Sequence, residues 1–270
     1  MSYKKSYIPA IGYTPLCIHG ECSLKLMDMG IIELDGKSSV EFETVDREAG
    51  FVILSGEADF AFDSTVWKNV GGRRSVFEGK AHSVYMPRGK RIKISSSMHT
   101  VIAVASAPVE VDTDPQLLTP ENTKSVVLGV KPCERYNDFL IDERSNAKHL
   151  TIGEAWITPG NWAGFPPHKH DVENMPDEGI YEEIYFYQFQ PKQGFGLQRM
   201  YTKDGEIDEC YTVKHNDLVE FPRGYHTTVG APGYNSYFLW MSAGEYQGFY
   251  RSYDPEHEWV AAVENIINKL

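Results

Sequence analysis

Short apolar or alternating segments, separated by turn residues, make up most of this chain. The segments are rich in β-branched and aromatic residues, and Gly, Pro, Asn or Asp bound them. Such segments are typical of β-strands, because these side chains pack well on a pleated, half-buried surface. The predicted strands are 40–45, 51–54, 59–62, 91–95, 101–105, 184–189, 195–201, 218–221 and 236–241. We therefore expect an all-β fold built from sandwiches or barrels.

One helix is predicted, near the C-terminus. Asp254 suits the N-cap and Pro255 the first helical position. The residues that follow place apolar side chains on one face, and such a stripe packs on a sheet or on a partner subunit. The stripe consists of Trp259, Val260, Val263, Ile266, Ile267 and Leu270. This prediction leaves a homo-oligomer open.

Composition narrows the classes of protein. Hydrophobic residues at 41% and charged residues at 24% are typical of a folded soluble chain. No apolar stretch approaches the roughly 18 residues of a membrane span. A net charge of −12 without a basic stripe argues against a nucleic-acid partner. The first 15 residues lack a secretory signal, so we expect a cytoplasmic protein, with Cys17, Cys22, Cys133 and Cys210 as free thiols.

A weak internal repeat divides the chain into two parts. The tetrapeptide at 86–89 ends in Pro-Arg-Gly, and so does the one at 221–224, 135 residues later, an offset of half the 270-residue chain. The same offset places Glu48 opposite Glu183. We therefore predict a tandem duplication of one β-domain. The polar segment 112–122 is the expected linker, which gives domains 1–122 and 123–270.

The densest group of metal-binding residue types lies in the second half. His168 and His170 are two residues apart, so on a strand they share a face. Glu182 and Glu183 come directly before an aromatic strand, and His226 follows a tight turn at 222–224. Three imidazoles and one carboxylate from either glutamate would form a metal site.

This order of motifs resembles the cupin signature, in which the carboxylate ligand immediately precedes the apolar strand residue. The resemblance selects His168, His170, Glu183 and His226 as metal ligands. It extends to the 5-deoxy-glucuronate isomerases of inositol catabolism, on the following segments: 55–56, 69–78, 166–171, 182–183, 194–195, 198–202, 219–226 and 254–259.

Membership of that family implies two tandem cupin domains, each a double-stranded β-helix or jelly roll. It also implies one divalent metal ion, with zinc favoured over manganese, iron or nickel. The expected substrate is a small anionic sugar acid, 5-deoxy-glucuronate. An aldose-ketose isomerisation through a metal-stabilised enediolate would convert it into 5-dehydro-2-deoxy-gluconate. In the first half the offset of 135 leads to Glu33 and Asp35, so that half is expected to be structural.

Substrate contacts are predicted from closeness in sequence to the metal ligands. A substrate carboxylate favours an arginine, and Arg199 and Arg223 are the nearest cations. Gln198 and Tyr185 are further candidates, Tyr185 because it shares a strand face with Glu183. The general base stays open between Glu183, a metal-bound hydroxide and Glu182.

Three alternative functions remain at this point. Another uronate ketol-isomerase, of the 4-deoxy-5-hexosulose-uronate type, would share the fold and the metal ligands. An iron-dependent cupin dioxygenase uses the same set of three histidines and one glutamate. A sugar-binding protein with two cupin domains would need no catalysis.

Overall fold

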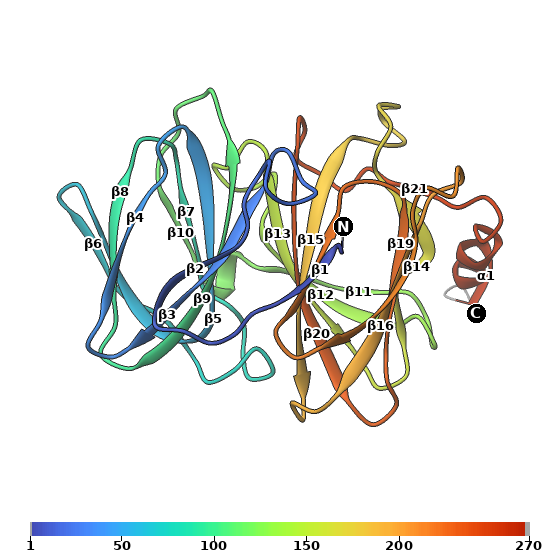
Figure 1. Ribbon diagram of the computed structural model, residues 1–270, viewed down its shortest axis with the longest axis horizontal. Coiled ribbons are helices and arrows are strands. Elements are labelled where there is room, and N and C mark those ends of the chain that lie inside the picture. Colours follow the sequence, from blue (N-terminus) through green and yellow to red (C-terminus); the bar gives the residue numbers. More distant parts are fainter. Residues whose placement is uncertain (1, 268–270) are drawn as a thin grey trace.

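The computed structural model describes residues 2–267 and consists of two antiparallel β-sandwiches that lie side by side (Figure 1). Nine strands build the first sandwich: β2 (Gly12–Cys17), β3 (Asp28–Asp35), β4 (Ser39–Glu43), β5 (Arg47–Phe62), β6 (Thr65–Arg73), β7 (Ser83–Met86), β8 (Arg91–Ser95), β9 (His99–Pro108) and β10 (Gln116–Leu118). The 3-10 helix η1 (Pro120–Asn122) follows. The all-β class predicted from the sequence is confirmed.

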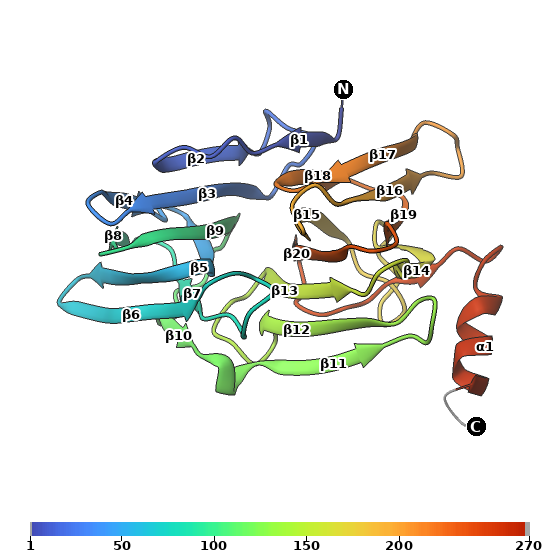
Figure 2. The same cartoon turned by 90° about the horizontal axis from the view of Figure 1, so that it is seen from below.

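The second sandwich takes its strands from the rest of the chain and from its very beginning. They are β1 (Lys4–Ser6), β11 (Lys124–Leu128), β12 (Arg135–Ile141), β13 (Leu150–Ile157), β14 (Trp162–Lys169), β15 (Tyr181–Gln190), β16 (Phe195–Tyr201), β17 (Asp208–Lys214), β18 (Asp217–Phe221), β19 (Tyr225–Gly230), β20 (Asn235–Gly244) and β21 (Ser252–Tyr253). Helix α1 (Trp259–Ile267) lies at the far end of the molecule in both views (Figures 1 and 2).

Each sandwich has a large and a small sheet. The large sheets have the orders β10-β7-β5-β9-β3-β2 and β1-β18-β15-β20-β13-β12-β11. The small sheet of the second half has the order β17-β16-β19-β14-β21. In the first half, β8 pairs with β4 and with the second part of β5, which also pairs with β6. The two halves therefore repeat one plan, with strand β1 added from the first part of the chain to the second sandwich.

Three apolar cores hold this arrangement together. One fills the first sandwich around Phe51 and Phe60, and another fills the second around Tyr187 and Phe238. The third joins the two large sheets. At Gly50 of β5, an added Cβ would lie 2.5 Å from the Ile152 side chain of β13, so a larger residue would require that side chain to shift.

Two buried glutamates clamp the halves together. Glu48 of β5 accepts hydrogen bonds from the backbone N–H groups of residues 148–150, which lead into β13. Glu182 of β15 accepts hydrogen bonds from those of residues 25–27, which lead into β3. Each of these glutamates is 9% exposed or less, and its carboxylate binds the opposite half of the molecule. The clamp is therefore reciprocal.

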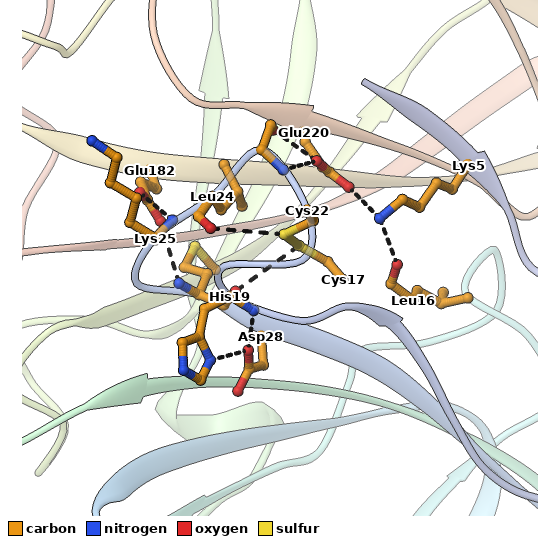
Figure 3. The surroundings of a disulfide bond; sticks show 12 residues. Lys5, Leu16, Cys17, His19, Cys22, Leu24, Lys25, Asp28, Glu182 and Glu220 are labelled. Carbon is orange, nitrogen blue, oxygen red and sulfur yellow. Dashed lines mark hydrogen bonds and ion pairs between the residues drawn. A yellow bond between two sulfur atoms is a disulfide. The ribbon is translucent and has the colours of Figure 1, made fainter. Parts of the chain in front are cut away.

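The loop that meets Glu182 also contains a disulfide, between Cys17 and Cys22 (Figure 3). The prediction of four thiols was wrong for this pair. A tight turn between the two cysteines brings their Cα atoms to 5.6 Å, within the range a disulfide spans. Ser23 in the same loop donates hydrogen bonds to Glu220 of β18 through its N–H and its hydroxyl. The disulfide thus constrains a loop that contacts two strands of the second sandwich.

Two predicted boundaries were also wrong. The segments 51–54 and 59–62 are one continuous strand, β5, with a bulge near Gly56 where the strand passes from the large to the small sheet. The helix begins at Trp259, four residues later than Pro255, because residues 255–258 form a turn, in which the Asp254 carboxylate accepts a hydrogen bond from the N–H of Glu256. Of the apolar stripe, Trp259 is 64% exposed, and Leu270 lies outside the described residues.

No helix among residues 2–267 is long and apolar enough to cross a membrane. The chain passes from the first sandwich to the second between β10 and β11, which includes the predicted linker end at residue 122.

Candidate metal centre

Three strands of the second sandwich bring the predicted ligands together. The register of β14 and β19 places His168 directly opposite His226. His170 follows two residues after His168, just beyond the end of β14. Glu183 comes from β15 of the opposite sheet. One ligand atom from each of the four residues lies within 4.8 Å of the others.

The cluster is closed off from solvent. His168, Glu183 and His226 are 3% exposed or less, and the His170 side chain is 11% exposed. Glu182 takes no part, since its carboxylate points to the other half of the molecule. The structure therefore gathers the four predicted ligands, with Glu183 as the carboxylate.

Backbone carbonyls orient all three imidazoles. In each ring the Nδ1 atom faces a carbonyl oxygen, which favours a proton on Nδ1 and leaves Nε2 toward the cluster. The carbonyls are those of Gly164 for His168 (3.2 Å), Tyr181 for His170 (2.8 Å) and Gly224 for His226 (3.3 Å).

The distances fit ligands of one ion. Glu183 Oε2 lies 2.9 Å from His170 Nε2 and 3.1 Å from His226 Nε2. Two ligand atoms that are about 2.1 Å from one ion lie about 3.0–3.4 Å from each other at ligand–metal–ligand angles of roughly 90–110°. His226 Nε2 is buried and makes no well-formed hydrogen bond. A lone pair in this position is costly unless a cation binds it.

Protonation in the cluster also suits a cation. Burial raises the pKa of Glu183, but the imidazoles of His170 and His226 outweigh it and lower this pKa to about 2. Burial, together with His226 and Arg251, lowers the pKa of His168 well below its usual value. Burial lowers the pKa of His170, but the bond to Glu183 outweighs it and the net shift is upward. An entering ion would therefore displace the proton that His170 shares with Glu183.

The other predicted site residues lie in different surroundings. Tyr185 is buried, and its ring centroid is 5.9 Å from that of His226. Gln198 is fully buried and is held by Tyr187 and by two backbone carbonyls. Arg199 bonds to the backbone carbonyl of Glu209 at the surface.

Arg223 is likewise on the surface. It forms ion pairs with Asp204 and Glu206, which are both exposed. Neither Arg199 nor Arg223 lines the space beside the metal ligands. Their closeness in sequence to the ligands therefore does not bring their side chains to the cluster.

Two narrow hollows adjoin the cluster, and both are bounded by His168, Glu183 and Arg251. One of them, which we call the Tyr181 hollow, is also lined by Tyr181 and His170. The other, which we call the Asn137 hollow, is also lined by Asn137, Arg135 and Tyr185. Each has a volume of about 20 Å³, which is room for about one water molecule.

Sequence reasoning missed four of these residues. Tyr181, Arg135 and Asn137 lie at or near strand ends without any local motif, and Arg251 lies 25 residues after the last ligand. Arg251 precedes the segment 254–259, which the family resemblance includes, and this was the one available signal.

The first half repeats the strand register without the ligands. In the second half Glu183 pairs with Phe221, and at the corresponding place in the first half Ala49 pairs with Met86. Ala49 therefore corresponds to Glu183, and Glu48 corresponds to Glu182. His168 pairs with His226 as Glu43 pairs with Arg91. The constant offset of 135 residues matched Glu33 and Asp35 to His168 and His170, and this was wrong. Those two residues lie in β3, whereas the strand that corresponds to β14 is β4. Glu43, Val45, Ala49 and Arg91 occupy the four ligand positions of the first half.

Comparisons with known proteins agree with this geometry. The 5-deoxy-glucuronate isomerase of Geobacillus thermodenitrificans (strain NG80-2) is 37% identical over 219 residues, which cover 81% of this chain and 80% of that protein. The enzyme of the same name from Bacillus subtilis (strain 168) is 34% identical over 240 residues, 88% of each chain.

Solved structures give the same picture. An IolB-like protein from Salmonella typhimurium LT2 superposes with a TM-score of 0.91 at 27% identity, covering 96% of this chain and 98% of that one. A mutant of the Bacillus subtilis oxalate decarboxylase superposes with a TM-score of 0.62 at 10% identity, covering 93% of this chain and 78% of that one, a likeness of fold alone. These neighbours confirm the predicted cupin fold. Residues 13–260 match the KduI/IolB family, and the chain therefore belongs to that family.

Proposed function

We propose that this protein is a metal-dependent isomerase that converts 5-deoxy-glucuronate into 5-dehydro-2-deoxy-gluconate. The buried cluster of His168, His170, Glu183 and His226 carries the proposal, since its four ligand atoms lie within 4.8 Å. Relatives named 5-deoxy-glucuronate isomerase, 32–37% identical over most of the chain, support the choice of substrate.

The reaction moves a proton between adjacent carbons while negative charge develops on the substrate's oxygens. A divalent ion bound by the cluster would supply a Lewis acid for that charge. Three neutral imidazoles and one carboxylate leave the ion a net positive charge, and we propose zinc, with manganese, iron or nickel as alternatives for metal analysis to decide.

Side chains around the cluster would position the sugar acid. Tyr181 lines one hollow, and its buried hydroxyl has no hydrogen-bond partner among the described residues, so we propose it as a donor to a substrate oxygen. The Glu183 carboxylate borders both hollows, and we assign the proton transfer to it. Glu182 is not available as a base because backbone N–H groups occupy its oxygens.

Substrate entry requires a movement. Pockets for small molecules usually have volumes of about 300–1,000 Å³, far more than the two hollows offer. The segment 248–250 lines the Tyr181 hollow and contains Gly248, whose φ of +145° suits a glycine. Because it forms part of the wall of this hollow, we propose that this segment moves when the sugar acid binds.

The experiment is to measure ketone formation from 5-deoxy-glucuronate together with metal content by elemental analysis. Wild-type protein should contain about one ion per chain and should lose turnover on chelation. His168→Ala should lose both the ion and turnover, whereas His99→Ala, in the first half, should keep both. Absence of turnover in metal-loaded protein would refute the proposal. Turnover of a different uronate would point to another ketol-isomerase, and substrate-dependent oxygen uptake to a dioxygenase.

The proposal includes a cytoplasmic location, which cell fractionation would test. It leaves the homo-oligomer open, and the exposure of Trp259 on α1 makes the oligomeric state in solution worth measuring.

A further inference from the structure

The Asn137 hollow is lined by hydrogen-bond donors and positive charge. Two guanidinium groups, from Arg135 and Arg251, and the amide of Asn137 border it next to His168 and Glu183. Glu183 is the one carboxylate among its lining residues, and it belongs to the metal cluster. In a protein of net charge −12, this concentration of cations beside a buried site favours an anionic ligand.

Arg251 is held at the hollow by its neighbours in the chain. It directly precedes β21, in which Tyr253 pairs with His168 of β14. Its guanidinium lies 4.2 Å from the centroid of the Phe249 ring, and it forms no ion pair with a carboxylate among residues 2–263, whose side chains the structure describes. Arg251 lines both hollows, next to His168 and Glu183. The guanidinium is therefore close to the metal ligands and available for a ligand.

Asn137 gives an independent indication of a ligand. Its side chain is 9% exposed, and its Nδ2 atom has no hydrogen-bond partner among the described residues. An unsatisfied buried donor lowers the stability of the folded state. A group that carries this cost at the edge of a metal site is well explained if a ligand accepts its hydrogen bond.

We propose that Arg251 and Asn137 bind the carboxylate of the sugar acid, with Arg135 adding positive charge from within the sandwich. The inference rests on the proposed function, since it assumes that the substrate is a uronate. Arg251 and Asn137 thus take the carboxylate-binding role that was predicted from the sequence for Arg199 and Arg223, whose side chains lie at the surface. The buried Arg135 donates to the carbonyl of Cys133, so its guanidinium is held in place.

This assignment also orients the substrate. The carboxylate would lie in the Asn137 hollow, and the other end of the sugar acid would extend past the ligands into the Tyr181 hollow. Tyr181 lines that hollow together with His168, His170 and Glu183, and its hydroxyl is buried without a hydrogen-bond partner among the described residues. The two unsatisfied donors would thus bind opposite ends of one molecule.

The test is calorimetric titration of metal-loaded protein with D-glucuronate and, as a probe without the carboxylate, D-glucose. A hydrogen bond to a charged group contributes about 1.5–3 kcal/mol, so Arg251→Met should weaken D-glucuronate binding about 10- to 100-fold. Arg251→Lys should recover part of the loss, because it restores the charge without the bidentate geometry. D-glucose affinity and metal content should not change.

Asn137→Leu separates a ligand-binding role from a structural one. It removes an unsatisfied buried donor, so the free energy of unfolding should stay the same or rise while D-glucuronate affinity falls. Arg223→Met and Arg199→Met are matched controls that should bind D-glucuronate like the wild type.

Several results would overturn the inference: wild-type affinity for D-glucuronate in Arg251→Met, equal losses for both sugars, loss of stability in Asn137→Leu, or a wild-type protein that does not prefer D-glucuronate. If binding depends on Arg251 but no uronate is converted into a ketone, the inference holds and the proposed activity fails. The two ideas are therefore tested separately.

Discussion

The adjacent residues Glu182 and Glu183 should respond in opposite ways to the same substitution. Glu182 accepts backbone hydrogen bonds at 2.7, 2.7 and 3.3 Å from residues 25–27. In Glu182→Gln, one acceptor oxygen becomes an NH₂ group that faces a backbone donor. Since each hydrogen bond to a charged group contributes about 1.5–3 kcal/mol, we expect a loss of about 2–4 kcal/mol in the free energy of unfolding. The metal site should remain intact.

Glu183→Gln should instead remove the metal ion. The variant loses the negative charge that lies 2.9 Å from His170 and 3.1 Å from His226. Bound metal stabilises the folded state by mass action, so chelation should lower the stability of the wild type and of Glu182→Gln. In Glu183→Gln, chelation should have no effect, because no ion is bound.

The assay is urea unfolding at pH 8, with and without chelator, combined with elemental analysis. Glu41→Gln, on the exposed side of β4, is the control for losing one negative charge and should change stability by less than about 0.5 kcal/mol. The reasoning fails if Glu182→Gln is as stable as this control, or if Glu183→Gln keeps its ion.

Three further predictions concern the scaffold. Replacing Cys17 and Cys22 by Ser should cost about 2 kcal/mol in urea unfolding, the amount expected for so short a loop, and stability equal to the wild type would contradict this. Arg73→Met should cost about 3–5 kcal/mol, because it leaves the buried Glu154 without a cation, with only the hydrogen bond from Tyr237; Arg73→Met with Glu154→Leu should recover most of the loss. Burial lowers the pKa of His215, so the metal-free protein should lose stability as the pH falls through about 6.5, where only the unfolded state gains the proton. His215→Asn should reduce that slope.

The strands with a strong local signal were predictable, namely β4, β5, β8, β9, β15, β16, β18 and β20, whereas others, such as β12 and β13, were not predicted. Alternating and aromatic segments marked nearly every predicted strand to within a few residues. The bulge in β5 was not predictable, because Ser55-Gly56 has the composition of a turn. In the structure, a Cβ on Gly56 would lie 2.6 Å from the carbonyl oxygen of His99, so the glycine serves a close approach between strands. Such contacts depend on distant residues that a local pattern does not contain.

The same distinction separates the metal ligands from the substrate contacts. The spacing of His168 and His170 on one strand is a local pattern, and the structure brings both to the cluster. Arg199 was predicted from closeness in sequence, but its side chain turns to the surface of β16. Arg251 and Asn137 reach the hollow through β21 and β12, which pair with different strands. Only the folded sheet shows that they are neighbours.

The duplicated halves distinguish the structural carboxylates from the chemical one. Glu48 and Glu182 occupy the same register position and bind backbone N–H groups of the opposite half. Both copies therefore keep the carboxylate that joins them. At the next position the second half has Glu183 and the first has Ala49, where no ligand is needed. The role of one glutamate in each copy is thus to hold the halves together, and the additional glutamate of the second copy is the one available to a metal ion.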